Sequence, residues 1–256
     1  MTLPVFFAPE LLGADRDDRG AALSWSGPEA DHARKVMRLG PADRLDLVDG
    51  AGTRATCVIE SVSSTGVELT VAESRVEPAP AVTVTLVQAL AKGGRDEQAV
   101  ELCTELGVDR IVPWSAQRSI ARWPADRAEK SRQKWVNVVR AATKQSRRAF
   151  LPVVDQLVDS GRLAQQLAEI SRRGGLVLIC DEEGTRTLTD QVHMWEQTAG
   201  EIVVVVGPEG GLTDAERDAF RDGGGQLVLI GPTVLRSSTA GGAALTLVNV
   251  LTGRWR

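Results

Sequence analysis

Apolar and polar residues alternate in short stretches of the first 75 residues, a pattern typical of strands with one buried face. Val67, Leu69 and Val71, for example, are each separated by one residue that is more polar or smaller. The Asp49-Gly50 pair between two such stretches is a hairpin turn signal. A helical pattern at 28–39 begins with Pro28. We therefore expect a small β domain with strands at 21–25, 44–50, 53–62 and 66–74.

The pattern changes after the proline-containing segment at 77–81, where continuous apolar runs alternate with helical stretches. Runs of this kind are typical of strands buried on both faces of a parallel sheet. The chain is therefore expected to divide into a first domain at 1–76 and an α/β domain at 77–256. The strands are expected at 82–89, 111–114, 176–180, 202–206 and 227–230. The helices are expected at 96–106, 124–147, 160–171, 213–221 and within 237–252.

The charge of the chain is unevenly distributed. Its 256 residues include 30 Lys and Arg against 34 Asp and Glu, which gives a formal net charge of −4. Residues 110–150, however, carry 11 basic and 2 acidic side chains. Such a block either binds a polyanion or is a solvated helix face balanced by acidic neighbours, and charge alone leaves both interpretations open.

Cysteine and histidine positions exclude several kinds of site. The three cysteines, Cys57, Cys103 and Cys180, are far apart, and His32 and His193 are equally isolated. A disulfide framework, a His/Cys metal cluster and a Ser-His-Asp hydrolase therefore all lack parts. These positions do not exclude a site built only of carboxylates, but we expect no metal. No apolar run approaches about 18 residues, and the first residues lack a basic targeting segment, so we expect a soluble cytoplasmic protein without a membrane partner.

Two loops follow expected strands of the second domain, at the edge where open α/β sheets bind ligands. The first, GPEGGLTDAE, follows the strand at 202–206 and carries Glu209 among glycines. Its Thr213 and Glu216 have the spacing of a capping box for the next helix. The loop lacks the glycine spacing of a dinucleotide fingerprint and of a P-loop. By itself it is as consistent with a structural turn as with a ligand site.

The second loop, IGPTVLRSSTAGGAAL, follows the strand at 227–230. Arg236 stands immediately before an expected helix start, where a cation and free amides together suit an anion, although a structural ion pair would also explain it. The small residues at 240–244 let the following helix approach another backbone closely. We expect that helix to pack against its own sheet or against another copy of the chain.

Together, the two loops resemble the bacterial 16S ribosomal RNA uridine N3-methyltransferase family of the SPOUT superfamily. Further segments similar to this family are HARKVMRL at 32–39, the stretch at 88–119 and AATKQSRRAFLPVV at 141–154. The resemblance implies an N-terminal PUA-like β-barrel domain, an α/β domain with a trefoil knot, S-adenosylmethionine as cofactor and a homodimer. It assigns the cofactor to Gly207, Glu209, Gly210, Ile230, Gly231, Leu235, Arg236 and Thr239.

The catalytic assignment follows from the charged residues of these loops and from one departure. Family members commonly have glutamate in the sequence LRTETA, whereas this chain has Ser238 at that position. Uracil N3 carries a proton at neutral pH, which must leave before or during methyl transfer. Our hypothesis is that Arg236 stabilises the negative uracil oxygen and that Glu209 orients the base or accepts its proton.

The resemblance also implies an RNA partner, 16S ribosomal RNA, within the small ribosomal subunit. An aromatic content of 4% argues against a sheet that stacks several bases. Two alternatives remain at this point: a SPOUT enzyme that methylates a ribose 2′-hydroxyl of transfer or ribosomal RNA, and a noncatalytic RNA-binding assembly factor. The candidates for phosphate contacts are Arg34, Lys35, Arg38, Lys92, Arg95, Arg118, Lys144, Arg147 and Arg148.

Overall fold

The computed structural model describes residues 3–13, 19–196 and 199–255. Contacts divide the chain into two compact units. The first unit comprises Met1–Ala79 together with Thr143–Leu151, and the second comprises Pro80–Ala142 together with Pro152–Arg256. Each unit is described by itself below.

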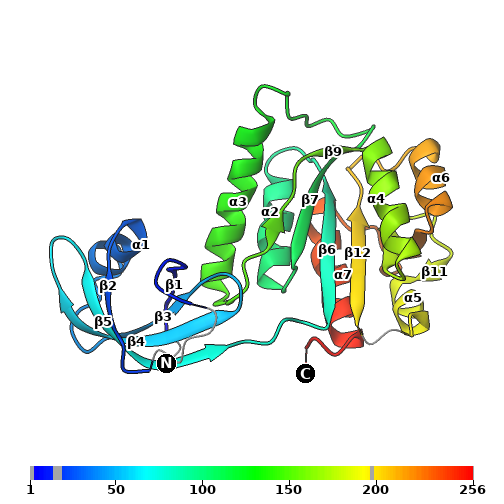
Figure 1. The fold of residues 1–256 in the computed structure, drawn as a ribbon. Helices are drawn as coiled ribbons and strands as arrows, with labels where there is room; N and C mark the ends of the chain where they lie inside the picture. Colours follow the sequence, from blue (N-terminus) through cyan, green and yellow to red (C-terminus); the bar gives the residue numbers. More distant parts are fainter. Residues whose placement is uncertain (1–2, 14–18, 197–198, 256) are drawn as a thin grey trace. The chain divides into compact units, whose positions relative to one another are not determined.

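The first unit is built on a five-stranded sheet with the order β1-β3-β4-β5-β2 (Figure 1). All neighbours are antiparallel except β1 and β3, which are parallel. The four strands expected from alternation are confirmed, whereas the short β1 was not foreseen. The bounds are β1 (Val5–Phe7), β2 (Ala22–Trp25), β3 (Arg44–Val48), β4 (Thr53–Val62) and β5 (Val67–Val76).

The prediction of a helix at 28–39 is wrong for the second half of that segment. An α-helix covers only α1 (Pro28–Asp31), and a π-helical segment η1 (His32–Val36) follows it. The Met37 amide donates to the His32 carbonyl, five residues back, and Arg38 has a φ of 57°, which ends the helix. Apolar burial still anchors the segment, since Ala30 and Ala33 belong to the core of the sheet.

One arginine joins three parts of the first unit. Arg54 on β4 is 6% exposed and donates to the Asp46 carboxylate on β3 at 2.9 Å and to Glu77 at 2.7 Å. Its third contact, at 2.7 Å, is the backbone carbonyl of Arg147 in the 143–151 segment. The guanidinium thus donates to three acceptors through Nε, Nη1 and Nη2, and it ties that distant segment to the sheet.

The second unit contains an eight-stranded parallel sheet with the order β11-β13-β10-β12-β6-β7-β8, with β9 also paired to β7. The five expected strands are confirmed, and three two-residue strands were too short to show a pattern. The bounds are β6 (Val82–Ala89), β7 (Arg110–Ser115), β8 (Val153–Val154), β9 (Val158–Asp159), β10 (Leu176–Cys180), β11 (Arg186–Thr187), β12 (Gly200–Val206) and β13 (Gln226–Leu229).

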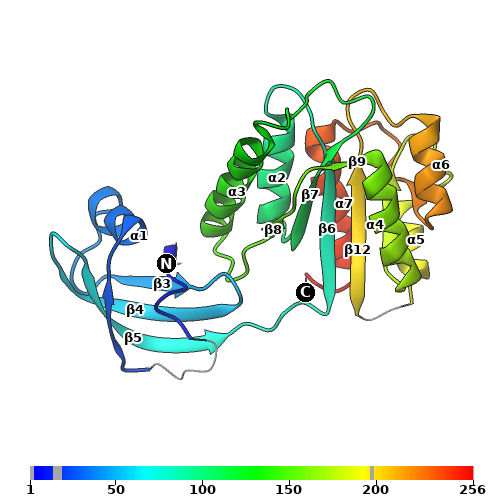
Figure 2. The same ribbon diagram turned by 45° about the horizontal axis from the view of Figure 1, so that its top comes forward.

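Helices cover both faces of this sheet. α2 and α7 pack on each other and on β6, while α4 and α6 pack together on the opposite face (Figures 1 and 2). The expected helices are confirmed, but α3 begins four residues later than expected and α5 was missed. The bounds are α2 (Arg95–Glu105), α3 (Ala128–Gln145), α4 (Ser160–Arg172), α5 (Leu188–Met194), α6 (Asp214–Asp222) and α7 (Ser237–Leu251).

Glycines in α7 allow it to pack closely against the unit's own α2 and β6. A Cβ atom at Gly242 would lie 2.5 Å from the Leu102 side chain on α2. At Gly241 it would lie 3.0 Å from Cys103 Sγ and 3.1 Å from Leu86 on β6. The small-residue pattern is therefore explained by packing within one chain. Within the part of the chain that the structure describes, no helix is both long and apolar enough to span a membrane.

We predict that Arg54→Ala destabilises the first unit by about 3–5 kcal/mol, because it leaves the largely buried Asp46 carboxylate and the Arg147 carbonyl unpaired. Native-state hydrogen exchange of the β3 and β4 amides measures this. The control is Arg75→Ala, because Arg75 is 59% exposed and its ion pair with Glu77 is long, at 3.6 Å, so its loss should cost little stability. Equal, small effects of both substitutions would contradict the role given to Arg54.

Candidate functional site

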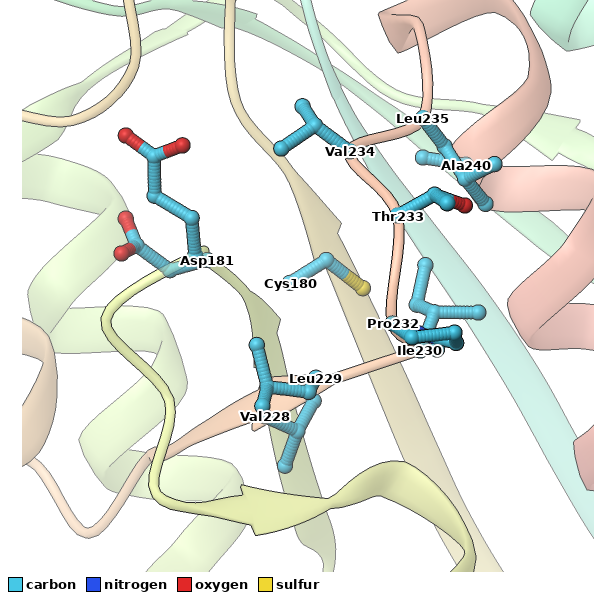
Figure 3. Close-up of a pocket in the computed structure, with 12 residues that line it drawn as sticks. Cys180, Asp181, Val228, Leu229, Ile230, Pro232, Thr233, Val234, Leu235 and Ala240 are labelled. Atoms are coloured by element: carbon cyan, nitrogen blue, oxygen red, sulfur yellow. The ribbon is translucent and has the colours of Figure 1, made fainter.

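Three loops meet where β13, β10 and β12 end side by side in the sheet. They line two adjoining cavities of about 360 and 530 Å³. The smaller cavity has mostly apolar walls, and the loop after β13 forms one side of it (Figure 3). Its residues include Cys180, Asp181, Val228, Leu229, Ile230, Gly231, Pro232, Val234, Leu235 and Ala240.

The larger cavity has a charged lining. Both cavities share the residues Cys180 to Glu182, Val234, Leu235 and Ala240, so they form one continuous site. The backbone of 206–212 borders the larger cavity. Its charged residues are Arg95, Arg118, Asp181, Glu182, Glu209, Arg217 and Arg236.

The loop after β12 owes its shape to glycine and to one arginine. Gly211 has a φ of 68°, which side chains with a Cβ disfavour, and a Cβ at Gly207 would lie 2.6 Å from Leu212 Cδ1. Arg118, in the loop after β7, donates to the carbonyls of Gly210 at 3.2 Å and Leu212 at 3.0 Å. The Arg118 guanidinium therefore fastens the two loops to each other.

A second fastening comes from Glu216 on α6, which is 1% exposed. Its carboxylate accepts hydrogen bonds from the Gln117 amide at 2.8 Å, Ser160 Oγ at 2.6 Å and the Thr213 amide at 2.9 Å. Burial raises the pKa of Glu216, but the hydrogen bonds from Ser160, Thr213 and Gln117 lower it more, so the pKa lies below its ordinary value. One buried charge thus joins α6, α4 and the loops after β12 and β7.

The Asp181 carboxylate at the end of β10 is also fixed. Arg217 on α6 donates to it at 3.1 Å, and both side chains are at most 9% exposed. Arg217 also pairs with Asp214 at 2.9 Å and with Glu183 at 3.1 Å. Asp181 therefore faces the cavity as a compensated charge held in one orientation.

Cys180 contributes surface to the cavity but no nucleophile. Burial, followed by the neighbouring Asp181 carboxylate, raises the pKa of its thiol to about 12. The thiol is therefore protonated at neutral pH. Among the described residues, no group of three or more His, Cys, Asp or Glu side chains is arranged to hold a metal ion.

Most of the cofactor residues expected from the sequence line these cavities. Ile230, Gly231 and Leu235 line the smaller one, and the larger one is lined by Gly207, Glu209, Gly210, Leu235 and Arg236. Thr239 lines neither cavity, and its hydroxyl donates to the Arg236 carbonyl at 3.1 Å.

The segment Cys180–Glu182 was missed by the sequence analysis, although it lines both cavities. A signal was available, because the apolar run at 176–180 is followed directly by acidic residues at the same edge of a parallel sheet.

The two proposed catalytic side chains both line the larger cavity. Arg236 is exposed, and Glu209 is 29% exposed and paired with Arg95 at 3.1 Å. Ser238 is only 5% exposed. The proton acceptor that this cavity offers is therefore the Glu209 carboxylate and not the side chain at position 238.

Basic residues proposed for RNA contacts in the first unit differ in availability. Arg34 is 14% exposed and bound to Asp31, which Lys35 also contacts at 2.7 Å. Lys144 is 17% exposed, pairs with Glu29 at 2.7 Å and lies 5.1 Å from the centre of the Phe6 ring. Lys144 therefore has an internal role in holding its segment to the sheet core. The more exposed members of this group are Lys35, Arg38 and Arg147, while Arg148 is partly buried.

Three candidates lie in the second unit. Lys92 is exposed in the loop after β6. Arg95 pairs with Glu209, and Arg118 binds the carbonyls of the loop after β12. Two of the three therefore border the larger cavity and support its loops.

Comparison with known families gives two matches. Residues 77–249 match the family described as RNA methyltransferase domain, and residues 26–72 match the RNA methyltransferase PUA domain. A Mycobacterium bovis protein named ribosomal RNA small subunit methyltransferase E is 42% identical over 238 residues, which cover 93% of this chain and 90% of that protein. A Bacillus subtilis protein of the same name is 27% identical and covers 92% of each chain.

Solved structures agree with the sequence relatives. The chain is similar to ribosomal RNA small subunit methyltransferase E from Neisseria gonorrhoeae bound to S-adenosyl methionine, with a TM-score of 0.82 and 25% identity over 98% of both chains. A methyltransferase from Legionella pneumophila in complex with the same cofactor gives the same TM-score, identity and coverage.

We predict that Glu216→Gln lowers the free energy of unfolding by about 1–3 kcal/mol at pH 7, because its amide group cannot accept from all the donors around it. The wild-type contribution is present above the unfolded pKa of about 4.3 and is lost as the pH falls through the lower folded pKa. The deficit of the variant should therefore shrink on acidification.

Urea unfolding between pH 7 and pH 3 measures this difference. The matched control on the same helix is Asp218→Asn, because Asp218 is 63% exposed and pairs only with the exposed Arg221 among the described residues. A deficit for Glu216→Gln that is the same at every pH would contradict the assigned role.

Proposed function

Because the chain belongs to the RNA methyltransferase family, we propose that it methylates N3 of a uridine in 16S ribosomal RNA, with S-adenosylmethionine as methyl donor. The names of the relatives and the cofactor-bound neighbours support S-adenosylmethionine-dependent methylation of ribosomal RNA. The choice of uracil N3, and of the small ribosomal subunit as substrate, is supported by the resemblance of the two loops to that family.

The residues present fit an adenosyl cofactor. The apolar walls of the smaller cavity suit an adenine ring, and its open backbone around Gly231 leaves polar groups accessible at the edge. The adjoining charged cavity suits the zwitterionic end of the molecule. We propose that 207–212 and 230–236 hold the cofactor as loops of a trefoil knot, in a homodimer.

The chemistry sets a requirement that this chain's residues must meet. When bound, S-adenosylmethionine supplies a methyl group made electrophilic by its sulfonium, without a metal. The N3 proton of uracil, with a nucleoside pKa of about 9, costs about 3 kcal/mol to remove at neutral pH. The site must therefore offset that cost by stabilising negative charge on the uracil and by accepting a proton.

Arg236 and Glu209 are assigned these two roles. The exposed Arg236 guanidinium is a donor for the uracil oxygen on which negative charge develops. Glu209 Oε1 is held by Arg95 at 3.1 Å, and no described side chain has a hydrogen bond to Oε2. Oε2 is therefore the atom that orients the N3–H group or accepts its proton.

The experiment that tests the function is methylation of purified small ribosomal subunits, followed by digestion and mass spectrometry of the nucleosides. The proposal expects 3-methyluridine that appears only when both the protein and S-adenosylmethionine are present. A 2′-O-methylated nucleoside would identify the ribose methyltransferase instead. No modification, combined with no binding of the cofactor in calorimetry, would support an RNA-binding assembly factor.

We predict that Arg236→Ala and Glu209→Gln each lower kcat about 10²- to 10³-fold in the presence of saturating cofactor. The matched control is Arg172→Ala, a 69% exposed arginine on α4. Calorimetry with S-adenosylmethionine shows whether each variant still binds the cofactor. A variant that binds the cofactor and turns over at the wild-type rate would remove that residue from the mechanism.

We also predict different results for two neighbouring basic residues. Arg147→Gln should weaken RNA binding and reduce the slope of log affinity against log salt by about 1, since Arg147 is exposed. Lys144→Gln should instead lower stability and leave that slope unchanged, because Lys144 pairs with Glu29. Filter binding over a series of salt concentrations checks both, and a flatter slope for Lys144→Gln alone would reverse the assignment.

A further inference from the structure

A second pair of cavities lies beside α4, on the face of the sheet that α4 and α6 cover (Figures 1 and 2). These cavities measure about 470 and 310 Å³ and share Ile170, Arg173 and Glu201, so they form one continuous groove, the α4 groove. Glu201 is the second residue of β12, whereas the loop of the candidate site follows Val206 at the other end of that strand. The α4 groove therefore lies at the opposite edge of the sheet, about 16 Å away along β12.

The floor of the α4 groove is mainly apolar. It is formed by Val112 on β7 and Thr85 on β6, which are 5% and 4% exposed, and by Ile170 on α4. Gly175 lets α4 lie close to the sheet here, because a Cβ would be 2.5 Å from Ile170 Cγ2 and 3.1 Å from the Glu201 carbonyl. The floor is thus shaped before a ligand binds, and an apolar surface of this kind suits the face of a nucleobase.

One face of α4 supplies the wall beside this floor with long polar side chains. They recur at helical spacing along the groove and are Arg162, Gln165, Gln166, Glu169 and Arg173. The first three make no side-chain hydrogen bond or ion pair among the described residues. A carboxamide offers both a donor and an acceptor, which suits the edge of a base. The two glutamines and Arg162 are therefore available to a ligand.

Ion pairs occupy most of the other charged side chains of the α4 groove. Arg110 pairs with Asp155 at 3.1 Å. Glu169 pairs with Arg172. Arg162 is exposed and has no such partner in the part of the chain that the structure describes. Its planar guanidinium can hold a phosphate through two parallel hydrogen bonds, so the groove keeps one cation for an anionic group.

The Glu201 carboxylate indicates that the ligand is more than a simple anion. Its Oε1 accepts a hydrogen bond from Thr85 Oγ1 at 2.8 Å, and no described group binds its Oε2. A carboxylate oxygen repels a bare phosphate but accepts a hydrogen bond from a hydroxyl or amino group. A ribonucleotide carries both kinds of group, since its phosphate is anionic and its ribose hydroxyls are donors. It therefore matches the cation, the amides and the acceptor of the α4 groove together.

We propose that the α4 groove binds a ribonucleotide. The base lies on Val112 and Ile170, the phosphate is held by Arg162, and a ribose hydroxyl donates to Glu201. The site is separate from the cofactor cavities, and only the source of the nucleotide rests on the proposed function. Under that function it is one unstacked nucleotide of the ribosomal RNA, whose strand continues into the adjoining 310 Å³ cavity. A free mononucleotide carries the same groups, and the experiments separate these two sources.

The first test titrates uridine 5′-monophosphate, adenosine 5′-monophosphate and inorganic phosphate separately into the ¹⁵N-labelled full chain. The side-chain amide signals of Gln165 and Gln166 report on the α4 groove. The proposal expects saturable shifts with at least one nucleotide at up to about 10 mM, and binding of phosphate about tenfold weaker. Arg162→Gln should weaken nucleotide binding about tenfold, because it removes the cation that holds the phosphate.

The matched control is Arg221→Gln on α6, because Arg221 is 56% exposed, pairs with Asp218 and does not line the α4 groove. It should leave the titrations unchanged. Both variants should bind S-adenosylmethionine as the wild type does, since neither residue lines the cofactor cavities. A loss of cofactor affinity in Arg162→Gln would overturn the claim that the α4 groove is a separate site.

Filter binding of 16S ribosomal RNA over a series of salt concentrations identifies the source of the nucleotide. A lower affinity of Arg162→Gln, with a slope of log affinity against log salt reduced by about 1, assigns the nucleotide to RNA. Wild-type RNA binding by a variant that has lost nucleotide binding assigns a free mononucleotide instead.

The site is overturned if neither nucleotide shifts the Gln165 and Gln166 signals, or if phosphate alone binds as tightly as the nucleotides. These outcomes are distinguishable from failure of the proposed function. Formation of 3-methyluridine by a protein that binds no nucleotide in the α4 groove would leave the function standing without this site. Saturable nucleotide binding without any 3-methyluridine would leave the site standing and overturn only its assignment to ribosomal RNA.

Discussion

The buried carboxylate of Glu216 is the constraint on which the candidate site depends. A parallel sheet brings the ends of its strands together, but it does not determine the shape of the loops that follow them. Glu216 accepts from Gln117, Ser160 and Thr213, so the loops after β7 and β12 are held by one ionised group. Arg118 completes the fastening through the Gly210 and Leu212 carbonyls. The cavity walls are therefore fixed before a ligand arrives, which lowers the cost of binding.

The charged side chains of the larger cavity are also held by specific local contacts. The chain has a net charge of −4, yet the larger cavity brings four arginines together with three carboxylates. Three of the arginines bind other groups of the protein, and the fourth does not. Arg217 and Arg118 are used to hold protein groups, and Arg95 holds Glu209, while Arg236 remains turned to the cavity. The pairing pattern, and not the net charge, determines which groups can act on a substrate.

Much of this arrangement was predictable from the sequence, because the apolar runs of β6, β10 and β12 and the loops after them have strong local patterns. The two-residue strands and the π-helical turn at 32–36 were not, since their formation depends on tertiary pairing. The sequence also placed 143–151 with the second domain, whereas contacts group it with the first through Arg54, more than 90 positions away.

We propose that the loops at the carboxyl edge of the sheet form a cofactor site already shaped in the unbound chain. A crystal structure of the protein with S-adenosylmethionine tests this most directly. We expect the adenine to lie against Ile230 and Leu235 in the smaller cavity, with the backbone of 116–119 and 207–212 displaced by less than about 1 Å. A cofactor bound elsewhere, or displacements of these loops above about 2 Å with the Glu216 contacts broken, would contradict it.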